Sequence, residues 1–234
     1  MTTRAQGTGG PPVGVMQRAA LILDALDGAE PLNLSQISAA TRLPLSSTHR
    51  ALEQLMALRW VHRVGKDYQL GMRLLELGSA AYHQNVLRSA ALPSLHRLHR
   101  TTGCVVHLGV LDGDEAVYLE KVGGELAVGI PSGVGLRMPA RSSAIGKALL
   151  AGSSNTTAPD GSGAREAQVV CEHERCMKGF SCLAIPIGPA GDGETAAISV
   201  FGSAAKLRTD QRIRLSVRTA AADIARRMAL AQRP

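Results

Sequence analysis

Apolar residues recur every three or four positions in three successive segments near the start of the chain. This spacing predicts amphipathic helices that pack their apolar sides together. The first helix is expected from Val15 to Leu26. The second is expected to begin at Ser35, a favourable N-cap residue, and the third to run from Leu45 to Leu58. Pro44 separates the last two helices, because proline disfavours helical backbone at the residue before it.

After Trp60 the pattern changes from a helical period to alternation. Two alternating stretches, Val61 to Val64 and Tyr68 to Leu70, flank a Gly-Lys-Asp turn at residues 65–67, which predicts a β-hairpin. Helices separated by a proline turn and followed by a hairpin are typical of a winged helix-turn-helix, whose recognition helix enters the DNA major groove. The same order of elements also occurs in protein-binding modules.

The outward side of the third helix carries polar residues, because leucines and Thr48 occupy its inner side. Short polar side chains let a helix N-terminus approach phosphate, and an arginine can pair with guanine or grip phosphate. Cations near the tip of the hairpin can reach backbone phosphate. The candidate DNA contacts are therefore Ser46, Ser47, His49, Arg50, Arg63 and Lys66.

A Leu- and Ala-rich helical connector from Leu70 to Arg88 leads into a second domain. A further helix ends at Gly103, and apolar or alternating runs then predict strands. The helix that ends at Gly103 and a final helix from Thr209 bracket these strands, and another helix begins at Ser143 among them, which predicts an α+β domain. The expected strands are residues 104–110, 116–122, 127–130, 182–187 and 195–201.

These elements divide the chain into four parts: a disordered arm at residues 1–12, a winged helix-turn-helix at 13–71, a linker and dimerisation helix at 72–88, and a sensing domain at 89–234. The net charge of +7 permits an anionic partner, but residues 13–75 hold seven basic residues against five acidic ones, so charge alone does not indicate DNA. The chain has no apolar run of about 20 residues and no secretory signal, so a cytoplasmic protein with reduced cysteines is expected.

Several motifs resemble the isocitrate-lyase-regulator (IclR) family of transcriptional regulators. They are residues 34–37 (LSQI), 43–52 (LPLSSTHRAL), 68–71 (YQLG) and 74–78 (LLELG). The resemblance implies a homodimer, or a dimer of dimers, that binds a palindromic operator. It also implies that the protein acts as a repressor, which is the usual output in the family. It also implies a C-terminal sensing domain with a fold similar to the GAF type. Leu45 stands where the family usually has a lysine, which removes a phosphate contact.

The resemblance further implies a pocket for a small organic effector, such as a carboxylic acid. Helix N–H groups suit a carboxylate, whereas a glutamate suits a hydroxyl or amine. Phe201 stands where the family often has a serine, and the interval from Ala151 to Val170 is shorter than the family's, so the sensing domain is shortened in the middle. A degenerate pocket without an effector is therefore an alternative. The implied effector residues are Ala144, Ile145, Glu172, Cys182 and Ser199.

Two other chemistries are suggested by parts of the sequence. Cys171, His173 and Cys176, followed by Cys182, are zinc-ligand types, but their spacing matches no established zinc signature. No metal and no cofactor are therefore expected. A GAF-like enzyme that modifies a small molecule remains the alternative of a different class. Turnover would distinguish it from a regulator, which instead requires salt-sensitive binding to DNA.

Overall fold

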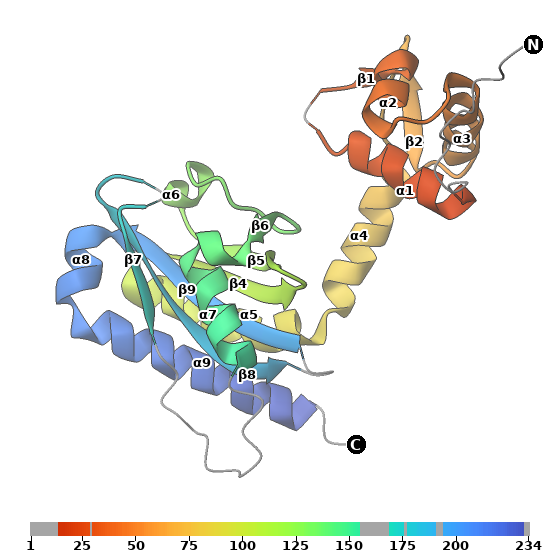
Figure 1. The fold of residues 1–234 in the computed structure, drawn as a ribbon. Helices are drawn as coiled ribbons and strands as arrows, with labels where there is room; N and C mark the ends of the chain where they lie inside the picture. Colours follow the sequence, from red (N-terminus) through yellow and green to blue (C-terminus); the bar gives the residue numbers. More distant parts are fainter. Residues whose placement is uncertain (1–13, 29, 155–168, 176, 191–193, 232–234) are drawn as a thin grey trace, which may run out of the picture. The chain divides into compact units, whose positions relative to one another are not determined.

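The computed structural model describes residues 14–28, 30–154, 169–175, 177–190 and 194–231. The chain divides into two compact units, Met1–Ala81 and Tyr82–Pro234 (Figure 1). The arm expected at residues 1–12 lies outside the described residues.

The N-terminal unit packs helices against a small antiparallel sheet. Its helices are α1 (Val15–Ala25), α2 (Leu34–Thr41) and α3 (Leu45–Ala57). Its strands are β1 (Leu32–Asn33), β2 (Val61–Val64) and β3 (Asp67–Leu70), in the order β1-β3-β2. The predicted winged helix-turn-helix is thereby confirmed. Apolar side chains from all three helices and the hairpin share one core, with Ile22, Ile37 and Leu52 fully buried.

Two local predictions in this unit were wrong. The N-cap of α2 is Asn33, not Ser35: the Asn33 side chain accepts from the Gln36 N–H at 3.1 Å, and the Gln36 side chain accepts from the Asn33 N–H at 2.8 Å. This capping box satisfies two backbone donors at once, and a cap at Ser35 would forgo it. The hairpin turn is also shorter than expected, because Asp67 already pairs with Val64.

The connector is not a single helix through Arg88. α4 (Met72–Gln84) ends before Asn85, whose backbone is extended and whose side chain accepts from the Arg88 N–H at 2.8 Å. Asn85 thus caps a new helix, α5 (Val86–Thr102), and Arg88 lies buried within it. Asparagine favours this interruption because its side chain competes for backbone hydrogen bonds.

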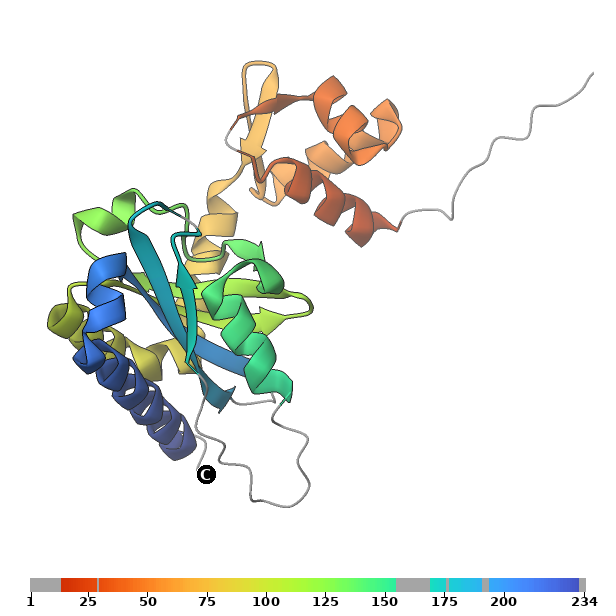
Figure 2. The same cartoon turned by 60° about the vertical axis from the view of Figure 1, so that its left-hand side comes forward.

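The C-terminal unit contains, within its described residues, a six-stranded antiparallel sheet in the order β6-β5-β4-β9-β8-β7. Its strands are β4 (Val105–Asp112), β5 (Glu115–Val122), β6 (Arg137–Pro139), β7 (Val170–His173), β8 (Phe180–Ala190) and β9 (Glu194–Ser203). α5 and α9 (Gln211–Ala231) cover one face, and α7 (Ala144–Ser154) covers the other (Figures 1 and 2). The α+β class is therefore confirmed.

Each face of this sheet has its own core. The face under α5 and α9 buries Leu95, Leu108 and Ile198. α9 buries an apolar stripe on this face as well: Ile213, Val217, Ala221, Ile224 and Met228. The face under α7 is lined mainly by alanines and Leu149.

Several predictions for this unit were wrong. Residues 127–130 form no strand; α6 (Glu125–Val128) lies there, and the third strand is β6. A run of four apolar residues fits a helical turn and a strand equally well, so its pattern does not decide. β7 and the short helix α8 (Ala204–Thr209) were not predicted at all. α7 extends through Ser154, and residues 155–168 lie outside the described part.

Candidate nucleic-acid interface and ligand site

α3 presents most of its predicted DNA-contacting residues to solvent. Ser46, His49 and Arg50 are exposed and Ser47 is half-buried. Thr48 is fully buried and its hydroxyl donates to the Pro44 carbonyl at 3.2 Å, which fixes the start of the helix. The N-cap, Pro44, makes no side-chain hydrogen bond, and the Ser47 N–H donates to the Pro44 carbonyl at 2.9 Å, so an incoming phosphate would meet the N–H groups of Leu45 and Ser46.

The two cations of the hairpin differ in their surroundings. Lys66 lies exposed in the two-residue turn. Arg63 lies on β2 opposite Tyr68; its Nε donates to the Gly65 carbonyl at 2.8 Å, and its guanidinium carbon is 5.5 Å from the Tyr68 ring centroid. Arg63 is therefore held against the hairpin beside its turn, and Lys66 is the cation in the turn itself.

The structure places the five predicted effector residues on the α7 side of the C-terminal sheet. Ala144 and Ile145 are the first residues of α7, and both are buried. Glu172 and Cys182 are direct partners across β7 and β8. Ser199 is buried on β9. Directly opposed residues of an antiparallel pair share a face, so Glu172 and Cys182 are neighbours, whereas Ser199 lies further along the sheet.

Glu172 has an unusual hydrogen-bonding state. It is 8% exposed, and its Oε1 lies 2.5 Å from Lys147 Nζ and 3.6 Å from Arg175 Nη1. Its Oε2 is buried and has no hydrogen-bond partner among the described residues. A buried carboxylate oxygen without a donor is costly, so this oxygen is a ready acceptor for a ligand.

The space beside Glu172 is closed. A crevice between Glu172, Cys182 and two stacked aromatic rings is too narrow to hold a water molecule. The rings of Phe180 and Phe201 are nearly parallel, with centroids 5.2 Å apart. Phe201 thus reduces the space at this position, as its size predicts.

A second polar group on the sheet was missed by sequence reasoning. The His107 Nε2 lies 2.9 Å from the Ser132 hydroxyl, and Lys121 Nζ donates to the carbonyls of Ile130 and Ser132 at 2.9 and 2.6 Å. Burial, together with the charge of Lys121, lowers the pKa of His107 to about 4, so its ring is neutral at pH 7. His107 is the direct partner of Ser199. In the sequence, only the position of His107 within an apolar strand indicates that its ring is buried.

The residues considered for zinc are divided between different surroundings. Cys171 packs against the core under α5 and α9, whereas Glu172 points to the other face. His173 Nδ1 lies 3.1 Å from the Ser181 hydroxyl. Cys176 lies outside the described residues, and the described ones contain no group of three potential metal ligands.

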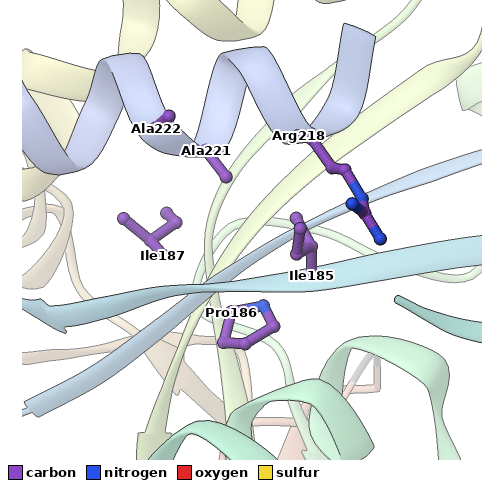
Figure 3. Close-up of a pocket in the computed structure, with 6 residues that line it drawn as sticks. All are labelled: Ile185, Pro186, Ile187, Arg218, Ala221 and Ala222. Carbon is purple, nitrogen blue, oxygen red and sulfur yellow. The ribbon is translucent and has the colours of Figure 1, made fainter. Parts of the chain in front are cut away.

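A separate hollow of about 240 Å³ lies between β8 and α9 (Figure 3). It is lined by Ile185, Pro186, Ile187, Arg218, Ala221 and Ala222. None of these residues is among the predicted effector contacts, and the volume is below the 300–1,000 Å³ usual for a ligand pocket. No helix in the described ranges is both long and apolar enough to span a bilayer.

A winged helix-turn-helix joined to an α+β domain with polar groups under one helix is the architecture of a two-domain transcriptional regulator. Two family models match the chain: the IclR helix-turn-helix domain over residues 15–65, and the bacterial transcriptional regulator IclR C-terminal domain over residues 79–159. Together they cover more than half of its length. The chain belongs to the IclR family.

Curated relatives share this assignment. The HTH-type transcriptional regulator XynR of Escherichia coli (strain K12) is 37% identical over 144 residues, which cover 60% of this chain and 57% of the relative. KdgR of the same organism is 36% identical, over 56% of this chain and 50% of the relative. The match thus spans about half the length of these two regulators. The repressor AllR of Salmonella typhimurium is 29% identical over 85% of this chain and 83% of the relative.

Solved structures show the same fold. An IclR homolog from Microbacterium hydrocarbonoxydans, complexed with 4-hydroxybenzoate, superposes with a TM-score of 0.74 at 24% identity, over 93% of this chain and all of that one. The Thermotoga maritima IclR gives a TM-score of 0.65 at 24% identity, over 91% and 98% of the two chains.

Proposed function

We propose that this protein is a sequence-specific DNA-binding transcriptional regulator whose operator affinity responds to a small organic effector. The observation that carries the proposal is the exposed polar side of α3, with Ser46, His49 and Arg50, in a chain of the IclR family. Arg50 is the residue assigned to a base edge, because a guanidinium can pair bidentately with guanine. Ser46 and Lys66 are assigned to phosphate.

The protein is proposed to act as a homodimer on a palindromic operator. α4 has no buried residue, and Met72, Leu75 and Leu77 remain 61%, 67% and 40% exposed. Exposed apolar side chains on a helix are suited to pairing with a second copy. Pairing would supply the two recognition helices that a palindromic site requires.

The effector is proposed to be a small organic acid that also carries a hydroxyl or amine. The unpartnered Oε2 of Glu172 calls for a hydrogen-bond donor, and the first turn of α7, at Ala144 and Ile145, suits a carboxylate. Because the crevice beside Glu172 is closed, binding would have to favour a second, open arrangement. A ligand shifts such an equilibrium only through its preference for one state.

One alternative has a specific observation in its favour. The crevice beside Glu172 excludes even water, and Phe201 fills part of it. A regulator with this degenerate pocket would bind its operator without effector control.

Repression is proposed as the output, since the AllR relatives are named repressors.

The proposal is tested by fluorescence anisotropy with genomic fragments that the full-length protein recovers from its own genome. Replacing Arg50 with alanine removes the proposed base contact, so affinity for a specific fragment should fall by about 1–3 kcal/mol. Arg137→Ala removes the same charge from the C-terminal unit and serves as the control. Equal affinities of the Arg50→Ala variant and the wild type would refute the assignment.

Effector control is tested separately, by a thermal-shift screen of hydroxy and amino acids. A hit should stabilise the wild type but not a Cys182→Phe variant, in which the larger side chain blocks the site. Equal stabilisation of both proteins would move the pocket elsewhere, and the absence of any hit would favour the regulator without an effector.

A further inference from the structure

A basic surface covers the helices on one face of the C-terminal sheet. α5, α8 and α9 together contain ten Arg and Lys residues, all but the buried Arg88 at least partly exposed, and a single acidic residue, Asp223. The whole chain has a net charge of +7, so these helices alone account for its positive charge. α5 and α9 pack side by side on the face of the sheet opposite α7 (Figure 2). The proposed recognition helix is not part of this surface.

Three arginines of this surface converge on one carboxylate. The Ser94 hydroxyl and the three guanidiniums donate to Asp223 and hold the pKa of its carboxyl far below the ordinary value, so Asp223 is charged at neutral pH. The donor distances are 2.6 Å for Ser94 Oγ, 2.6 Å for Arg97 Nη2, 2.5 Å for Arg226 Nη2 and 3.2 Å for Arg227 Nε.

The cluster keeps an excess of positive charge at the surface. One carboxylate neutralises one of the three guanidiniums, which leaves a net charge of +2. The side chains of Arg97, Arg226 and Arg227 nevertheless stay 52%, 72% and 42% exposed. Asp223 therefore holds them in place without covering them. Arginines already held in place lose less side-chain entropy when they bind an anion.

The chemistry of the surface favours nucleic acid over a membrane. Eight of the nine cations that are not buried are arginines, whose planar guanidinium matches phosphate geometry. A helix that lies in a membrane interface presents a free apolar side, usually with aromatic residues. α5, α8 and α9 contain no Phe, Trp or Tyr, and the apolar stripe of α9 is buried against the sheet.

We propose that this α5–α9 surface, comprising Arg97, Arg100, Arg212, Arg226 and Arg227, is a second, sequence-independent contact for the phosphates of duplex DNA. The choice of DNA as the polyanion rests on the proposed function. The surface would hold DNA that lies outside the bases read by α3. It would add affinity and salt dependence, but no sequence preference.

The test compares two double variants of the full chain with the same change in charge. Arg97→Gln/Arg226→Gln removes the two most exposed arginines of the cluster and leaves Arg227 and Ser94 on Asp223. Arg137→Gln/Arg141→Gln removes two exposed arginines near β6 and is the control. Each protein is titrated by fluorescence anisotropy against a labelled random-sequence duplex over a series of salt concentrations, and its folding is checked by circular dichroism.

The cluster variant should bind the duplex about 10- to 60-fold more weakly at 0.1 M salt. Its plot of log affinity against log salt should be flatter by roughly 1.8, since each lost phosphate contact lowers the slope by about 0.9. The control variant should keep the slope of the wild type. An equal loss in both variants, or no loss in the cluster variant, would overturn the inference.

Two further arms separate the remaining outcomes. In the first, the cluster variant would lose the wild type's binding to phosphatidylglycerol vesicles but keep its binding to the duplex. This result would make the surface a membrane contact and refute the DNA assignment. A wild type that binds neither genomic fragments nor the random duplex would refute the proposed function itself. A wild type that binds both, with the cluster variant indistinguishable from it, would refute only the second contact.

Discussion

The start of α5 is joined to β5 by a buried ion pair whose removal has a calculable cost. Arg88 Nε donates to Glu120 Oε2 at 2.8 Å, and the two side chains are only 10% and 9% exposed. The Tyr82 hydroxyl donates to the same oxygen at 2.6 Å, and its ring lies 3.4 Å from the Arg88 guanidinium carbon. This contact ties Tyr82 and Arg88, both within the C-terminal unit, to β5.

Replacing Arg88 with methionine keeps the length of the side chain but leaves Glu120 charged, buried and without its cation. Breaking a buried pair in this way costs about 3–5 kcal/mol. The double variant Arg88→Met/Glu120→Met removes both charges and should recover most of that loss, because a buried pair and an apolar pair of similar size are often close in stability. Tyr82→Phe should cost roughly 1.5–3 kcal/mol, the usual value for a hydrogen bond to a charged group.

The assay uses the position of the chain's one tryptophan. Trp60 lies in the N-terminal unit, so tryptophan fluorescence follows that unit during urea unfolding, whereas far-ultraviolet circular dichroism follows both. Arg88→Met should move the dichroism transition of the C-terminal unit to lower urea and leave the fluorescence transition in place.

Two results would refute this reasoning. A loss below about 1 kcal/mol in Arg88→Met would mean that the pair is solvated and therefore weak. A double variant as unstable as the single one would mean that packing, and not the uncompensated charge, sets the cost.

Three further predictions follow from local geometry. The pKa of His107 falls from 6.5 to about 4 on folding, so between these pH values the unfolded chain binds more protons than the folded one. The free energy of unfolding should therefore drop by roughly 3 kcal/mol as the pH falls from 6.5 to 4. Urea titrations at several pH values should show a smaller drop for the His107→Asn variant. Asn33→Ala should cost the N-terminal unit about 1 kcal/mol by tryptophan fluorescence, whereas the matched Ser35→Ala should change little, and the reverse order would contradict the capping box. Gly146→Ala should destabilise the C-terminal unit, because its Cβ would lie 2.2 Å from a backbone carbonyl oxygen, whereas Gly78→Ala in the exposed α4 should raise its helical stability by about 0.5–1 kcal/mol; dichroism melts that reverse this order would contradict the structure.

The sequence by itself determined the elements whose signals are local. The helical spacing of α1 and α3, the glycine turn of the hairpin and the long stripe of α9 each depend on residues close together in the chain, so periodicity and turn chemistry were enough. The same reasoning failed for short segments such as α6, where four residues fit two structures, and at Asn85, where one side chain decides whether a helix continues.

Only the tertiary structure decided which polar groups meet. Lys147 reaches Glu172 across 25 positions of the chain, and His107 reaches Ser132 across another 25, because sheet register and the docking of α7 bring them together. The convergence of Arg97 on Asp223 spans 126 positions and depends on the packing of α5 against α9. A single sequence specifies the chemistry of each side chain, but contacts between distant side chains depend on how the elements pack.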